Sequence, residues 1–349
     1  MSEVEPAALG LALDGGPLPL FDRAPSRPHG TSPLRRPGSV RRTSSIDAIW
    51  PDGRDGVTSL SADARDIFTP LVGRAPQILA HDHADVLADH RVIRAVTSDP
   101  PRPQLADLAG ARAGGYLRAA LDAVLHEERV AGTPLYLLLD DMAGATLVAG
   151  WAWSRWMDNW MPQRPVEDVE AHLRKMEGIC IGFRPGSHAL GLGGRPRPDQ
   201  NVTRVAPLAN PEDPDGWHRL VDRGGVNFRR ARRIDVWRQD GLIQIDSTFQ
   251  DSASAPDGGE RIAIHEYRLH ATADADAKIL LSAEATPGTL PYAECPAAPT
   301  NIKAVVGTRL DELRDTVLLT LRKTAGCTHL NDMMRSLAEV PRLAAALPA

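Results

Sequence analysis

The second half of the chain contains four residues whose types could form a metal or thiol site. His265 lies in the strand-like run IAIHEYRLH, Cys295 lies in LPYAECPAAP, and Cys327 and His329 lie together in GCTHLND. Thiolate and imidazole are ligands that zinc and iron prefer. We therefore expect His265, Cys295 and Cys327 to bind zinc or iron, with His329 as a fourth ligand or a nearby base.

Cys327 also has the expected position of a reactive thiol, in the first turn of a helix. Free backbone N–H groups and the helix dipole lower the pKa of a thiol there. Asp251, after the run TFQ, is a candidate base or fourth ligand. One alternative is a metal-free thiol enzyme, with Cys327 as nucleophile, His329 or His265 as base, and Asp251 orienting that base. Another is a non-catalytic scaffold or partner-binding protein in which the cysteines are packed.

Three other polar groupings favour structural roles. In HDHADVLADH, strand spacing places His81, His83 and Asp85 on one face, which could chelate a metal but is more typical of a solvated strand. The pair Asp140 and Asp141 follows an apolar run and is expected at a solvated end. Cys180 lies among apolar neighbours and is expected to be a buried thiol.

The elements that must position these residues recur in a similar order in the two halves. Apolar alternation predicts strands near 46–50, 57–60, 77–80 and 92–96, followed by helices at 113–128 and 134–142. The second half has strands near 234–236, 242–245, 262–269 and 278–283, then a helical run at 305–321. This order predicts an internal duplication. The expected fold class is α+β, with two similar halves that are each an antiparallel sheet with helices on one face.

We divide the chain into four segments. Residues 1–40, rich in Pro, Gly, Ser and Arg, are a predicted flexible arm. The basic residues Arg35, Arg36, Arg41 and Arg42 either contact an acidic partner or, the favoured interpretation, belong to a solvated basic stretch. Residues 41–150 form the first α+β repeat, and 227–349 form the second repeat with the site. Residues 151–226 are a Trp-rich connecting segment with a helix at 166–176. Its four tryptophans either line an aromatic substrate pocket or, the favoured interpretation, pack in the core.

Composition excludes several classes of protein. A net charge of −5 over 349 residues provides no basic field for nucleic acid. No apolar run approaches the ~20 residues of a membrane span, and the acidic N-terminal stretch does not have the pattern of a secretory signal. Three cysteines in a long chain indicate reduced thiols, so we expect a cytoplasmic protein. A small-molecule substrate fits this composition, and the oligomeric state stays open.

Several stretches resemble the bacterial family of domain of unknown function 2889. They are FRRARRIDVW, HEYRLHATAD, LPYAECPAA and GCTHLNDMMRSLAEV, with RRTSSIDAIWPDG and MEGICIGFRPGSHAL earlier in the chain. This resemblance implies membership of the family and no particular activity. The expected function therefore rests on the residues: a zinc- or iron-binding protein and, if it is an enzyme, one whose metal activates water or polarises a carbonyl of a small apolar or aromatic substrate.

The second half also resembles, more distantly, the iron–sulfur cluster assembly scaffold proteins. His265, Cys295 and Cys327 fall on the three ligand positions of that family, and residues 306–308 occupy its turn. Those proteins have Cys-Gly-Asp on the strand, where this chain has His265-Glu266-Tyr267. A mixed His/Cys set favours zinc or mononuclear iron over a transferred cluster.

Overall fold

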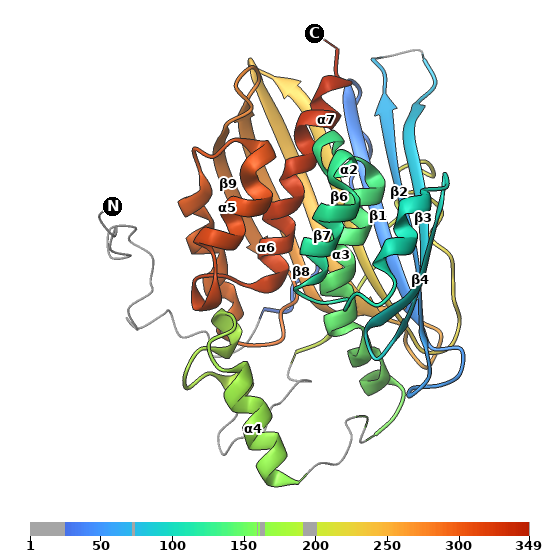
Figure 1. Ribbon diagram of the computed structural model, residues 1–349. Helices are drawn as coiled ribbons and strands as arrows, with labels where there is room; N and C mark the ends of the chain where they lie inside the picture. Colours follow the sequence, from blue (N-terminus) through green and yellow to red (C-terminus); the bar gives the residue numbers. More distant parts are fainter. Residues whose placement is uncertain (1–24, 72–73, 159, 161–164, 191–200, 349) are drawn as a thin grey trace.

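The central feature of the computed structural model is one antiparallel sheet that both halves of the chain build (Figure 1). The structure describes residues 25–71, 74–158, 160, 165–190 and 201–348, so most of the predicted arm lies outside the described residues. The strand order is β4-β3-β2-β1-β6-β7-β8, and both β5 and β9 pair with β8. The strands are β1 (Ser39–Ile49), β2 (Thr58–Thr69), β3 (Gln77–Asp89), β4 (Val92–Asp99), β5 (Thr203–Arg204), β6 (Asn227–Gln239), β7 (Leu242–Ala253), β8 (Ile262–Asp274) and β9 (Leu280–Pro287).

Helices cover one face of this sheet, and α4 stands apart at one end (Figure 1). The α-helices are α1 (Leu117–Val124), α2 (His126–Ala131), α3 (Pro134–Val148), α4 (Val166–Met176), α5 (Leu313–Thr320), α6 (Thr328–Arg335) and α7 (Val340–Ala345). Short 3₁₀ helices are η2 (Pro103–Leu108), η3 (Ala149–Arg155), η4 (Ile181–Phe183), η5 (His188–Leu190), η6 (Cys295–Val305), η7 (Leu310–Glu312), η8 (Lys323–Ala325) and η9 (Ser336–Glu339). The predicted α+β class is confirmed, as is the helix at 166–176. The internal duplication stays a prediction.

The two halves meet at the β1–β6 pair, where charged residues are buried. The antiparallel register sets Arg41 opposite Asp235 and Arg229 opposite Asp47. In each pair the arginine Nε lies 2.6 Å from the aspartate Oδ1. The prediction that Arg41 and Arg42 continue a solvated basic stretch is therefore wrong, because they are 1% and 0% exposed. Strand pairing brings carboxylates from distant segments to them.

Asp140 and Asp141 also differ from expectation. They lie in the middle of α3, 4% exposed each, and not at a solvated end. Asp140 accepts hydrogen bonds from Arg335 at 2.7 Å and Arg314 at 2.6 Å. Asp141 accepts a pair of hydrogen bonds from Arg232 at 2.8 and 3.0 Å. Asp141 thus meets an arginine of β6, whereas Asp140 meets arginines of α5 and α6. These arginines need the carboxylates, because an unpaired buried charge is strongly unfavourable.

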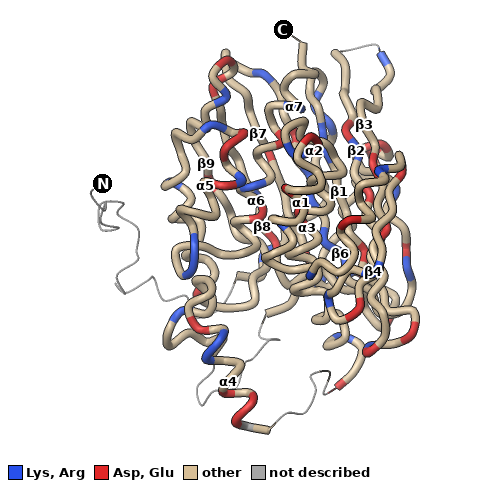
Figure 2. The backbone as a smooth tube through the Cα atoms, viewed as in Figure 1, with Lys and Arg blue, Asp and Glu red and all other residues tan. Residues whose placement is uncertain are grey.

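Asp140, Asp141 and their arginine partners belong to a larger set of charged residues between the sheet and the helices, which we call the buried ion network. It contains as many arginines as carboxylates, so its formal charges balance. Arginine and lysine positions lie on the central strands as well as at the rim of the molecule (Figure 2). Its members are Arg42, Arg118, Arg230, Arg232, Arg314, Arg335, Asp66, Asp140, Asp141, Asp251, Asp332 and Glu339.

The tryptophan segment continues α3 into η3. Trp151 is 5% exposed and belongs to the core, as the favoured interpretation expected. The combined helix Pro134–Arg155 has the length and composition of a membrane span, but 78% of its most apolar stretch is buried inside the protein. Such burial is typical of the core helix of a globular protein.

Candidate metal site

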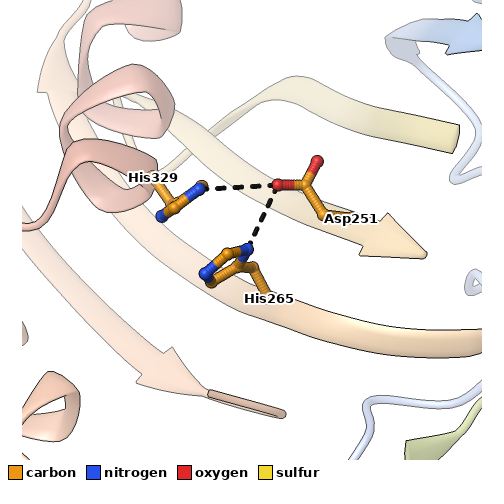
Figure 3. Close-up of side chains that lie close together, drawn as sticks. All are labelled: Asp251, His265 and His329. Atoms are coloured by element: carbon orange, nitrogen blue, oxygen red, sulfur yellow. Dashed lines mark ion pairs between the residues drawn. The ribbon is translucent and has the colours of Figure 1, made fainter. Parts of the chain in front are cut away.

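Three side chains from three elements meet where β7 and β8 pass under α6. Asp251 on β7 lies directly opposite His265 on β8, so both point to the helix-covered face. His329, in the first turn of α6, lies above them. His265 Nδ1 lies 3.3 Å from Asp251 Oδ2, and His329 Nε2 lies 3.6 Å from the same oxygen. Figure 3 shows both rings directed at that carboxylate, and their centroids lie 3.5 Å apart.

The two ring nitrogens that face Asp251 are buried and have no hydrogen-bond partner among the described residues. Buried polar atoms in folded proteins are normally partnered. The three potential ligand atoms all lie within 4.8 Å of one another. Two ligands at about 2.1 Å from one ion are themselves about 3.0–3.5 Å apart, so small side-chain shifts would seat a cation here.

The protonation states also suit a cation. Burial lowers the pKa of His265, and burial together with the neighbouring His265 lowers that of His329 well below its ordinary value. Burial would raise the pKa of Asp251, but the Arg230 guanidinium outweighs it and the pKa falls below the ordinary range. At neutral pH both imidazoles are therefore neutral and the carboxylate is ionised, which are the forms that bind metals.

Arg230 fixes the carboxylate. Its Nε and Nη2 donate to Oδ1 and Oδ2 of Asp251, both at 2.9 Å, and its Nη1 donates to Asp332 at 3.2 Å. Helix α3 approaches this guanidinium at Gly144, where an added Cβ would lie 1.9 Å from Arg230 Nη1. Asp332 also accepts a hydrogen bond from Arg118 at 2.5 Å, so two guanidinium groups share this carboxylate.

The predicted ligands are brought together only in part. Asp251, His265 and His329 converge, whereas Cys295 and Cys327 lie outside this group. Cys327 Sγ is 3.9 Å from His329 Nδ1, the nitrogen on the other side of the ring from Nε2. An ion held by Nε2 would therefore not reach this sulfur.

The cysteines lie in the core beside the site. Cys327 is the N-cap of α6, as its predicted position at the helix start required. The prediction that its pKa is lowered is wrong: burial raises it, because the thiol is 3% exposed and a buried thiolate is poorly solvated. Burial also raises the pKa of Cys295. An added Cβ at Gly182 would lie 3.0 Å from the sulfur of Cys295 and 3.8 Å from that of Cys180, so these two thiols are neighbours as well.

The His81–His90 run has the character of a solvated strand face. His83 Nδ1 lies 3.0 Å from Asp63, and its Nε2 lies 3.0 Å from Asp85. These carboxylates outweigh partial burial and raise the pKa of His83. Its two nitrogens are thus already partnered, unlike those of the buried pair.

Comparison with known proteins gives a family match over part of the chain. No curated protein and no solved structure matches the chain. Residues 228–342 match the model of a protein family of unknown function, DUF2889. The matched segment contains most of β6, all of β7, β8 and β9, and α5 and α6, and hence Asp251, His265 and His329. Over this segment, the chain is similar to the DUF2889 family of proteins of unknown function.

Proposed function

We propose that the protein binds a divalent transition-metal ion, zinc or iron, through Asp251, His265 and His329. The observation that carries the proposal is the convergence of two buried, unpartnered imidazole nitrogens on one carboxylate oxygen. Two histidines and one carboxylate form a ligand set used by non-haem iron(II) and by catalytic zinc. Such a set leaves coordination positions open for water or substrate.

In this proposal the neighbouring residues hold the ligands in place. Arg230 keeps Asp251 oriented, and the Nδ1–H of His329 donates to the Cys327 sulfur, which leaves Nε2 free to bind. A bound ion would supply Lewis acidity or an activated water to a small apolar or aromatic substrate. The free thiols Cys180, Cys295 and Cys327 suit a reducing compartment, so we propose a cytoplasmic location.

Elemental analysis of untagged protein tests the proposal. We expect about one zinc or iron ion per chain, and its loss in His329→Gln and His265→Asn. His83→Gln is the matched control, because His83 is also a histidine between carboxylates but lies on an accessible strand face. Thermal melts establish that each variant folds. Less than about a tenth of an ion per chain under reducing, metal-replete conditions, or equal content in folded His329→Gln, would contradict the proposal.

A thiol enzyme is the second candidate, because the side chain of His329 lies between the Cys327 thiol and the Asp251 carboxylate. Cys327 Sγ lies 3.9 Å from His329 Nδ1, and His329 Nε2 lies 3.6 Å from Asp251. It ranks second because burial raises the pKa of the thiol, whereas an activated nucleophile needs a thiolate. Alkylation by iodoacetamide distinguishes the two: rapid, selective modification of Cys327 at pH 7 would favour the thiol enzyme.

A further inference from the structure

We infer that the protein has a second ligand site, for a small aromatic carboxylate, between the β3–β4 turn and the start of η3. A cavity of about 200 Å³ lies there. Its side-chain lining includes Trp50, Arg54, Asp55, Thr58, His90 and Arg91. None of these residues belongs to the candidate metal site, so this inference is independent of the proposed function.

Two arginines, Arg54 and Arg91, and one aspartate, Asp55, supply the charged lining of the cavity. Arg91 is half-buried, and its Nε donates to the Ala113 carbonyl at 2.9 Å. Burial and the nearby Arg112 lower its pKa. No ion pair among the described residues includes Arg91 or Arg54, although both line the cavity. Two partly buried guanidinium groups without an ion-pair partner in the described part of the chain can both bind one carboxylate, so this lining suits a ligand that brings its own negative charge.

The backbone is strained at the loop that carries two of the lining residues, His90 and Arg91. His90 and Arg91 form the two-residue loop between β3 and β4, with φ of 45° and 67°. Hairpin loops with two positive φ values favour Asn-Gly or Asp-Gly, and the β6–β7 hairpin has Asp240-Gly241 at the same positions. Strained non-glycine residues cluster at ligand sites. Here the strained loop carries a guanidinium to the cavity.

A glycine leaves space for the guanidinium of Arg91. Gly114 faces Arg91, and an added Cβ there would lie 2.9 Å from Arg91 Nη2. Any larger residue at position 114 would have to displace the end of the arginine side chain. The loop and the facing glycine thus both favour an arginine at this wall.

Trp50 indicates that the ligand also contains an aromatic ring. It lines the cavity, and its ring packs edge-on against Trp153 with centroids 5.6 Å apart. An indole offers a flat apolar surface to a planar ring. The cavity is smaller than the roughly 300–1,000 Å³ of pockets for drug-sized ligands, so a single ring fits its size. Together these walls fit one aromatic ring that bears a carboxylate.

Titration with benzoate, followed by tryptophan fluorescence and calorimetry, tests the inference. We expect saturable binding in the millimolar range or tighter, weakened at least about tenfold in Arg91→Asn, because a charge-assisted hydrogen bond is lost. Asparagine tolerates positive φ, so this variant keeps the turn. Trp50→Leu should weaken binding and reduce the fluorescence change. Arg94→Gln is the control, because Arg94 is exposed on β4 and pairs with Asp89; its binding should change less than about twofold.

Three results would overturn the inference. The first is absence of saturable benzoate binding to the folded wild-type protein. The second is unchanged affinity in Arg91→Asn. The third is binding of benzamide, cyclohexanecarboxylate or inorganic phosphate as tightly as benzoate, since each lacks the charge or the aromatic ring that the site is inferred to recognise. Metal analysis reports on the other site, so either conclusion can fail alone.

Discussion

Asp140→Asn is the sharpest test of the buried ion network. The carboxylate accepts from Arg335, Arg314 and Arg118, at 2.7, 2.6 and 3.2 Å. These guanidinium groups lower the pKa of Asp140 below its ordinary range, against the opposing effect of burial. Asparagine has nearly the same volume, so the change removes the charge and leaves the packing.

The expected loss follows from this geometry. Removing one partner of a buried ion pair costs about 3–5 kcal/mol, because the remaining charge stays desolvated. That is a large fraction of the roughly 5–15 kcal/mol that stabilises a typical folded protein. We expect Asp140→Asn to lower the free energy of unfolding by about 3–5 kcal/mol and the melting temperature by roughly 4–7 °C.

Urea unfolding and thermal melts measure this loss. Asp315→Asn is the matched control: Asp315 also pairs with an arginine, Arg129, but its side chain is 66% exposed. Exposed pairs contribute about 0–1 kcal/mol, so the control should change little. If the two variants lose the same stability, the reasoning about charge burial at Asp140 is refuted.

Two further predictions concern packing and pH. Gly144→Ala should lower the free energy of unfolding by about 3 kcal/mol or more in urea titrations, because its Cβ would lie 1.9 Å from Arg230 Nη1. The control Gly150→Ala, whose Cβ would meet nothing within 4 Å, should change it by less than about 1 kcal/mol; equal effects would contradict the close approach. Burial lowers the pKa of His218 to about 3, so between pH 6.5 and about 3 the unfolded chain binds a proton that the folded protein does not. The free energy of unfolding should therefore decrease as the pH is lowered from 6.5 to about 3, by up to about 1.4 kcal/mol per pH unit from this residue. His218→Gln should flatten that slope, and an unchanged slope would exclude His218 as its source.

The secondary structure was largely predictable, because apolar and polar residues alternate along a strand that has only one buried face. The strands near 57–60, 77–80, 92–96 and 262–269 are all present in the structure, extended at one or both ends. The β1–β6 pair was harder, because both faces of these strands are covered. A strand buried on both faces normally has an apolar sequence, whereas this pair carries arginines, so the sequence predicts that Arg41 and Arg42 are solvated.

The candidate metal site was predictable in its histidines and less so in its carboxylate. A usable signal was present: Asp251 and His265 are equally far from Gly258, at the turn between β7 and β8, and such positions face each other in a hairpin. The sequence could not show that Cys295 and Cys327 lie outside this group, because residue type alone does not say on which side of His329 a sulfur lies. The partners of the buried arginines could not be read from the sequence. Arg42 and Glu339, for example, are 297 residues apart and meet only after the sheet and η9 have formed.

The β1–β6 pairing also sets the order of events as the chain is made. β1 cannot complete its hydrogen bonding until β6, about 190 residues later, has left the ribosome, which at roughly 5–20 residues per second takes about 10–40 s. During that time β1 is a free edge, the kind of surface that invites pairing with other chains. Arg41, Arg42 and Asp47 put charges along that edge, and charged edges resist such pairing. The side chains that later join the two halves would thus protect the nascent strand from aggregation.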